Sequence, residues 1–151
     1  MHSNHYLPLS IMVVLSFISM YVLMYAMVDG MTNVYANFNQ VYMAALMTAP
    51  MIIFELILMR AMYRNAKLNT LILLLSVLML LGSFLMIRDQ TAISDRQFIR
   101  SMIPHHAGAL LMCDEAPLTD PELVELCKSI KESQQREIDQ MRAILARLEN
   151  Q

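Results

Sequence analysis

The sequence predicts an all-α membrane protein with three transmembrane helices followed by an extramembrane antiparallel helical hairpin. The 151 residues are 57% apolar and 16% charged, which is more hydrophobic than an ordinary soluble domain of this size. Charge is concentrated at residues 95–151, with ten acidic and seven basic side chains. Two predicted helices, each with its own start pattern and separated by a short turn, lie in this charged part. We therefore expect a membrane domain at 1–90 and a helical hairpin domain at 91–151.

Three apolar segments are long enough to cross a bilayer, which takes about 20 helical residues. The first runs from Leu7 to Val28, and no cleaved secretory signal is expected because residues 1–5 contain no Lys or Arg. The second, 41–59, contains a proline and Glu55, and the third is 71–87. An ionisable residue within a span is a functional candidate. Glu55 lies close enough to the end of its span to pair locally instead.

The loop between the second and third spans predicts the orientation. Arg60, Arg64 and Lys67 make it the basic loop of this half of the chain, and the positive-inside rule places such a loop in the cytoplasm. The N-terminus is then cytoplasmic, and residues 88 onward lie outside, in the periplasm of a bacterium, with the spans in its inner membrane. Arg88, at the other end of the third span, favours the opposite orientation, but one basic residue is outweighed by the three in the loop. The acidic balance of the C-terminal part argues against nucleic-acid binding.

Sixteen methionines are more than a generic apolar core needs. On the first two spans they recur at spacings of three and four, which keeps them on one helix face. Thioethers suit Cu(I) or Ag(I), so a stripe of them could hold or pass such an ion, but Met also fills irregular packing gaps. The stripe consists of Met20, Met24, Met27, Met31, Met43, Met47 and Met51.

The hairpin is predicted from its capping residues. Ser94 and Gln97 fit a capping box that starts a helix running to about Glu115. After the turn at 116–121, Thr119 or Asp120 is expected to cap a second helix over 122–150. Fewer than 60 residues bury little apolar surface by themselves, so we expect a second copy to complete a four-helix bundle.

Soft metal ligands are concentrated on the predicted hairpin. Pro104 is expected to kink or restart the first helix just before two adjacent histidines, and the donor side chains recur at spacings of four and seven, which place them on shared or neighbouring faces. Imidazole, thiolate and thioether together indicate a soft metal, with zinc as the alternative. The candidate ligands are Met102, His105, His106, Met112, Cys113, Cys127, Glu137 and Met141.

The two cysteines allow two interpretations. Cys113 and Cys127 lie symmetrically about residue 120, so an antiparallel hairpin could place them opposite each other as a disulfide. Spacing alone favours a structural disulfide and a thiolate metal site equally.

The segment Met102-Ile103-Pro104-His105-His106, followed by Gln134-x-x-Glu137-Ile138-x-x-Met141, resembles domain-of-unknown-function family 305 over roughly residues 91–148. The three-span region resembles the membrane-anchored branch of that family. The resemblance implies a ferritin-like helical bundle and copper or silver binding in the cell envelope. The two cysteines are not part of the family pattern. The ligands that the resemblance implies are Met102, His105, His106, Glu137 and Met141.

We therefore expect a non-enzymatic envelope protein that binds copper, as Cu(I) or Cu(II), for tolerance or delivery, with silver or zinc as alternative ions. It is expected to be embedded in the lipid bilayer as a homodimer. The alternative is an accessory structural subunit whose methionine-rich spans pack against a larger membrane complex.

Overall fold

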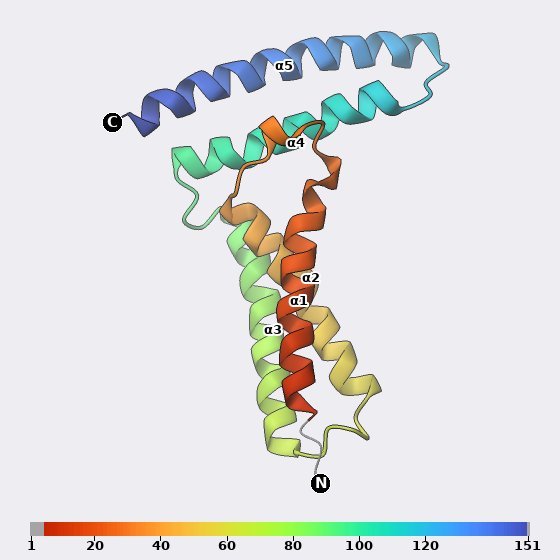
Figure 1. Ribbon diagram of the computed structural model, residues 1–151, viewed down its shortest axis with the longest axis vertical. Coiled ribbons are helices and arrows are strands. Elements are labelled where there is room, and N and C mark those ends of the chain that lie inside the picture. Colours follow the sequence, from red (N-terminus) through yellow and green to blue (C-terminus); the bar gives the residue numbers. More distant parts are fainter. Residues whose placement is uncertain (1–4, 151) are drawn as a thin grey trace. The chain divides into compact units, whose positions relative to one another are not determined.

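The computed structural model describes residues 5–150, which form five α-helices and two short 3-10 helices, without a strand in that range. The N-terminal end, predicted to be cytoplasmic, falls on residues 1–4 and lies outside the described part. The all-α prediction is confirmed (Figure 1). The elements are α1 (Tyr6–Leu23), η1 (Met24–Met27), η2 (Met31–Asn33), α2 (Phe38–Leu58), α3 (Ala66–Arg88), α4 (Asp95–Glu115) and α5 (Pro121–Glu149).

Three of these segments are long and apolar enough to cross a membrane, as the sequence predicts. They are Tyr6–Met27, Phe38–Leu58 and Ala66–Arg88, with mean hydropathies of 2.2, 2.0 and 2.6. At about 1.5 Å per residue each can cover a hydrocarbon core of about 30 Å. The third helix begins earlier than predicted because the Asn65 side chain accepts a hydrogen bond from Leu68 N (3.1 Å) and caps its first turn.

Contacts within the chain divide it into two compact units. The membrane unit comprises the described residues up to Met24 together with Asn39–Thr91. The hairpin unit comprises Tyr25–Phe38 and the described residues from Ala92 onward. The segment Tyr25–Phe38, here called the strap, was expected to belong to the membrane domain at 1–90, but it groups with the hairpin.

Small side chains are buried along the helices of the membrane unit. Ala44, Thr48 and Ala49 are buried on α2, and Ser76 and Ser83 are buried on α3, seven residues apart. Small residues let membrane helices approach closely. α2 is the most enclosed span, with 28% of its apolar window buried against 6% and 11% for the other two.

A polar cluster joins the helix ends at the loop between α2 and α3. Tyr6 Oη donates to Asn69 Oδ1 (2.8 Å), and Asn69 Nδ2 donates to Tyr63 O (2.7 Å). Tyr63 is 5% exposed, and its hydroxyl donates to Glu55 Oε1 (2.9 Å). Glu55 therefore pairs locally, in line with the structural interpretation of this residue.

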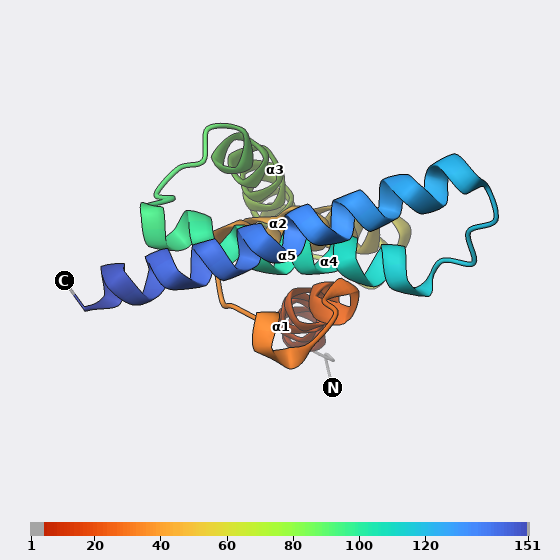
Figure 2. The ribbon, with the colours of Figure 1, turned by 90° about the horizontal axis from the view of Figure 1, so that it is seen from above.

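In the hairpin unit, α4 and α5 lie side by side and run antiparallel (Figure 1, Figure 2). Both predicted caps are present. The Ser94 side chain accepts from Gln97 N, and Asp120 Oδ1 accepts from Leu123 N (2.9 Å), with Pro121 in the first turn of α5. In a complete capping box the Gln97 side chain would also accept from the backbone N–H of Ser94. Here Gln97 Oε1 accepts instead from Phe38 N (2.9 Å), at the end of the strap.

Of the two outcomes predicted for Pro104, a kink or a restart, the restart is wrong, since α4 continues from Asp95 to Glu115. Proline has no N–H, so the carbonyl of Arg100, one turn earlier, loses its usual intrahelical donor. Asn37 of the strap donates Nδ2 to this carbonyl (3.4 Å). The strap therefore satisfies a group that the proline leaves unpaired, which lets the helix continue.

The hairpin core is covered in part by the chain itself. It consists of residues on the facing sides of α4 and α5, and Val28 and Tyr35 of the strap pack against it. A second copy of the hairpin was expected because no other segment of the chain was predicted to cover the apolar side chains of the hairpin. The strap covers part of them, and the dimer stays a prediction. The buried core residues are Ile99, Ile103, Ala107, Leu110, Ile138 and Leu145.

Candidate functional site

The central residue of the candidate site is His106, which is 7% exposed and has both ring nitrogens in contact with oxygen atoms. Nε2 lies 2.7 Å from Glu137 Oε2 on α5, and Nδ1 lies 2.9 Å from the carbonyl oxygen of Met102, one turn earlier on α4. A carbonyl and a carboxylate are both acceptors, so the two hydrogen bonds are made together when the ring carries both protons. In that state His106 and Glu137 form an ion pair.

The His106–Glu137 contact fixes how the donor residues line up along the two helices. In an antiparallel pair, one turn toward the start of α4 corresponds to one turn toward the end of α5. Met102, four residues before His106, therefore lies at the level of Met141, four residues after Glu137. Both methionines are half-buried, and Met141 packs against the hairpin core. One imidazole, one carboxylate and two thioethers thus lie within about one helical turn.

Two other predicted ligands lie apart from this set. The side chain of His105 is exposed, with its ring centroid 6.2 Å from that of His106. Met112 is 53% exposed and lies six residues further along α4. The structure places His106 in contact with Glu137, and the helix spacing puts Met102 and Met141 one turn away on the same side, whereas Met112 lies outside this set.

The cysteines adopt one of the two arrangements that the spacing allows. Cys113 and Cys127 form a disulfide, with their Cα atoms 5.4 Å apart. Neither sulfur is a thiolate in this state, so neither is available as a ligand. Within residues 5–150, no three His, Cys, Asp or Glu side chains are grouped so that they could hold a metal ion by themselves.

Sequence reasoning missed the polar residues that attach the strap to the hairpin. Asn33 is 6% exposed, donates to Asp29 Oδ1 and accepts from Arg142 Nη2, both at 2.7 Å. Asn37 is also buried and reaches the Arg100 carbonyl. The available signal was two asparagines four residues apart between two apolar spans, since a buried amide needs partners.

The methionines predicted on the first span do not share one helix face, whereas Met43, Met47 and Met51 all lie on the continuous helix α2. The regular helix α1 ends at Leu23, and Met27 and Met31 lie in separate 3-10 helices, 53% and 85% exposed. A face predicted from 3.6 residues per turn is lost where the turn tightens and the chain then bends. Within the membrane unit, Met20 Sδ accepts from Thr48 Oγ1 (3.7 Å), a contact typical of packing. Met43 and Met47 are 38% and 43% exposed; Met24 and Met51 are half-buried.

These features describe a protein with three helices suited to a membrane and a helical pair that carries a histidine–carboxylate contact, with one methionine on each helix a turn away. The family model described as "Domain of unknown function (DUF305)" matches residues 81–145, which include α4, the turn and most of α5. The chain belongs to this family, which confirms the family part of the predicted resemblance; its membrane-anchored branch and its link to copper stay predictions. A similar protein is "Uncharacterized protein L153" from Acanthamoeba polyphaga mimivirus, 31% identical over 138 residues, covering 89% of each chain. No solved structure matches.

Proposed function

We propose that the hairpin binds a soft monovalent cation, Cu(I) or Ag(I), through His106, Met102 and Met141, for tolerance or delivery in a cell envelope. The observation that supports this most directly is the hydrogen bond between His106 Nδ1 and the carbonyl of Met102. Histidines that ligate metals typically donate their other ring N–H to a carbonyl or carboxylate, which fixes the tautomer. Nε2 is then the ligating nitrogen, and it faces Glu137.

The chemistry of the donor set fits such an ion. Thioether and imidazole are soft or intermediate neutral ligands, which suit Cu(I) and Ag(I). They can surround a monovalent ion in a partly apolar place without adding charge that must be desolvated. The carboxylate of Glu137 would balance the single positive charge. Its side chain is 53% exposed, so it has room to move away from Nε2 as the ion enters.

Two features support placing the hairpin on the outer side of the membrane. The disulfide between Cys113 and Cys127 is typical of oxidising compartments. The basic residues Arg60 and Arg64 lie between α2 and α3, and Lys67 lies in the first turn of α3; basic loops of this kind stay in the cytoplasm. One crossing by α3 then brings the hairpin to the opposite side.

Titration of the full chain in detergent micelles with Ag(I), a redox-inert probe, tests the proposal. We expect one ion per chain under non-reducing conditions. His106→Asn should weaken binding at least about tenfold, the scale of disrupting a metal ligand's surroundings. Met102→Leu and Met141→Leu remove sulfur while nearly conserving volume, and each should also weaken binding.

Met112→Leu provides the matched control, because it removes an exposed thioether from the same helix. Its affinity should equal that of the unmodified chain. If His106→Asn and Met112→Leu bind silver equally well, the proposed site is wrong. Circular dichroism of each variant establishes that the helices are retained.

A further inference from the structure

The half of the hairpin nearest the turn has no buried core, unlike the half that contains His106. After Leu110 on α4 and before Ile138 on α5, no described residue is buried. Several apolar side chains there are exposed, including Leu123 (44%), Leu126 (53%) and Met112 (53%). This region, 111–137, is here called the distal half. Since it contains no core, its two helices are joined mainly by the disulfide and by an ion pair between Lys131 and Asp114.

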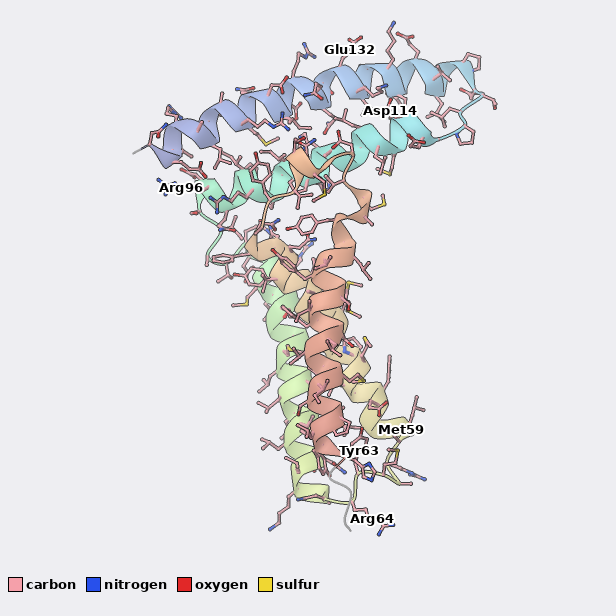
Figure 3. The ribbon with its side chains drawn as sticks, viewed as in Figure 1. Met59, Tyr63, Arg64, Arg96, Asp114 and Glu132 are labelled. Carbon is pink, nitrogen blue, oxygen red and sulfur yellow. A yellow bond between two sulfur atoms is a disulfide. The ribbon has the colours of Figure 1, made fainter. Side chains whose placement is uncertain are left out.

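The disulfide is open to a reaction partner. Both cysteines are only half-buried, and they line a surface hollow of about 490 Å³ together with Val124, Lys128 and Lys131. The positive charge of the two lysines favours a thiolate over a thiol. Glu132 also lines the hollow, and Asp114 is paired with Lys131, so the lysine charge is partly offset. Figure 3 shows Asp114 on α4 and Glu132 on α5.

Three features limit how far the two sulfur atoms can separate after reduction. The connection between α4 and α5 is short, the Asp120 cap holds the first turn of α5, and the Lys131–Asp114 pair adjoins Cys113. The Cα atoms start 5.4 Å apart. Two thiols held at this separation can bind one cation together.

We propose that Cys113–Cys127 is a thiol–disulfide exchange site whose reduced form is a second site for a soft cation such as Cu(I) or Ag(I). The disulfide and thiolate alternatives that the spacing allows are then two states of the same pair. The inference deepens the proposed function by adding a redox-controlled site, and it does not depend on the His106 site being correct.

The reductant is a dithiol. One of its thiolates attacks a sulfur of the pair, the S–S bond breaks, and the other cysteine leaves with the electron pair and takes a proton. The second thiolate of the reductant then attacks the mixed disulfide and releases the remaining cysteine, which is also protonated. Two electrons and two protons reach the pair, and the reductant becomes a disulfide. A cation that binds both sulfurs displaces the two protons.

The experiment compares the full chain in detergent before and after treatment with dithiothreitol, followed by its anaerobic removal. Without denaturant, alkylation and mass measurement should show complete reduction while circular dichroism retains the helices. The reduced chain should then bind one more silver ion than the oxidised chain. It should bind that ion about 100-fold or more tightly than Cys113→Ser or Cys127→Ser alone, because the second thiolate acts intramolecularly.

The variants separate this inference from the proposed function. The double variant Cys113→Ser/Cys127→Ser should bind the same number of ions with and without dithiothreitol. His106→Asn should still gain one ion on reduction, even if the His106 site proves wrong. The inference is overturned if the pair reacts only at the rate of global unfolding, or if the reduced pair binds silver no more tightly than a single cysteine.

Discussion

At the scale of single residues, polar side chains that the sequence leaves inconspicuous make specific contacts. Asn37 supplies the donor that Pro104 withholds from the Arg100 carbonyl, and Asn33 links Asp29 to Arg142. His106 is held by a backbone carbonyl on one side and Glu137 on the other. In each case a buried polar group is paired, which avoids the penalty of about 1–3 kcal/mol for an unsatisfied one.

Tyr63 offers a measurable consequence at this scale. Burial, and after it the hydrogen bond and charge of Glu55, raise the pKa of Tyr63 from 10.0 to about 12. Glu55→Gln should lower this pKa but not restore it to 10.0, because burial remains. Alkaline spectrophotometric titration, with Tyr63→Phe to identify the signal, measures the change.

The raised pKa of Tyr63 also makes the stability of the folded chain depend on pH. The pKa in the folded chain lies above that of the unfolded chain, so the contribution of Tyr63 is fully present below pH 10 and is lost as pH rises toward 12. An unchanged late titration in Glu55→Gln would show that the carboxylate does not contribute.

At the scale of elements, the strap acts as a third component of the helical pair. Tyr25 Oη donates to Tyr35 O (2.7 Å) and closes the strap on itself, while Val28 and Tyr35 pack on the hairpin core. The strap also lies against α4 at Gly108, where an added Cβ would lie 3.2 Å from the carbonyl oxygen of Met27. Backbone atoms cannot rotate aside as a flexible side chain does.

Gly108→Ala should therefore loosen the strap, although alanine favours a helix by about 1 kcal/mol. We expect a net cost of about 1–3 kcal/mol, typical of overpacking, and faster hydrogen exchange at Tyr25–Phe38. Gly82→Ala is the matched control, because its Cβ would meet nothing within 4 Å. Equal strap protection in both variants would mean that the strap adjusts without loss.

At the scale of the whole molecule, the chain combines three segments suited to a bilayer with a charged helical pair. If the positive-inside rule applies, protease added from outside intact cells or spheroplasts should cut the hairpin and spare the loop 59–65. Replacing Arg60, Arg64 and Lys67 by Gln should weaken or reverse this pattern. Cleavage of the loop but not of the hairpin would contradict the predicted orientation.

The sequence by itself determined the features that depend on neighbouring residues. Span length, the Ser94 and Asp120 caps and the turn between the last two helices are local, so residue type and spacing predict them. It also identified the family and the residues around His106. The same local reasoning failed for the methionines of the first span, because one helical period was carried past the end of α1 at Leu23.

Only the tertiary structure decided which distant residues meet. The register that joins His106 to Glu137, the choice of a disulfide for Cys113 and Cys127, and the docking of the strap all pair residues that are far from each other along the chain. Such pairings depend on how several helix faces bury apolar surface and satisfy polar groups at once. Spacing within one segment carries no information about which face of another segment it will meet.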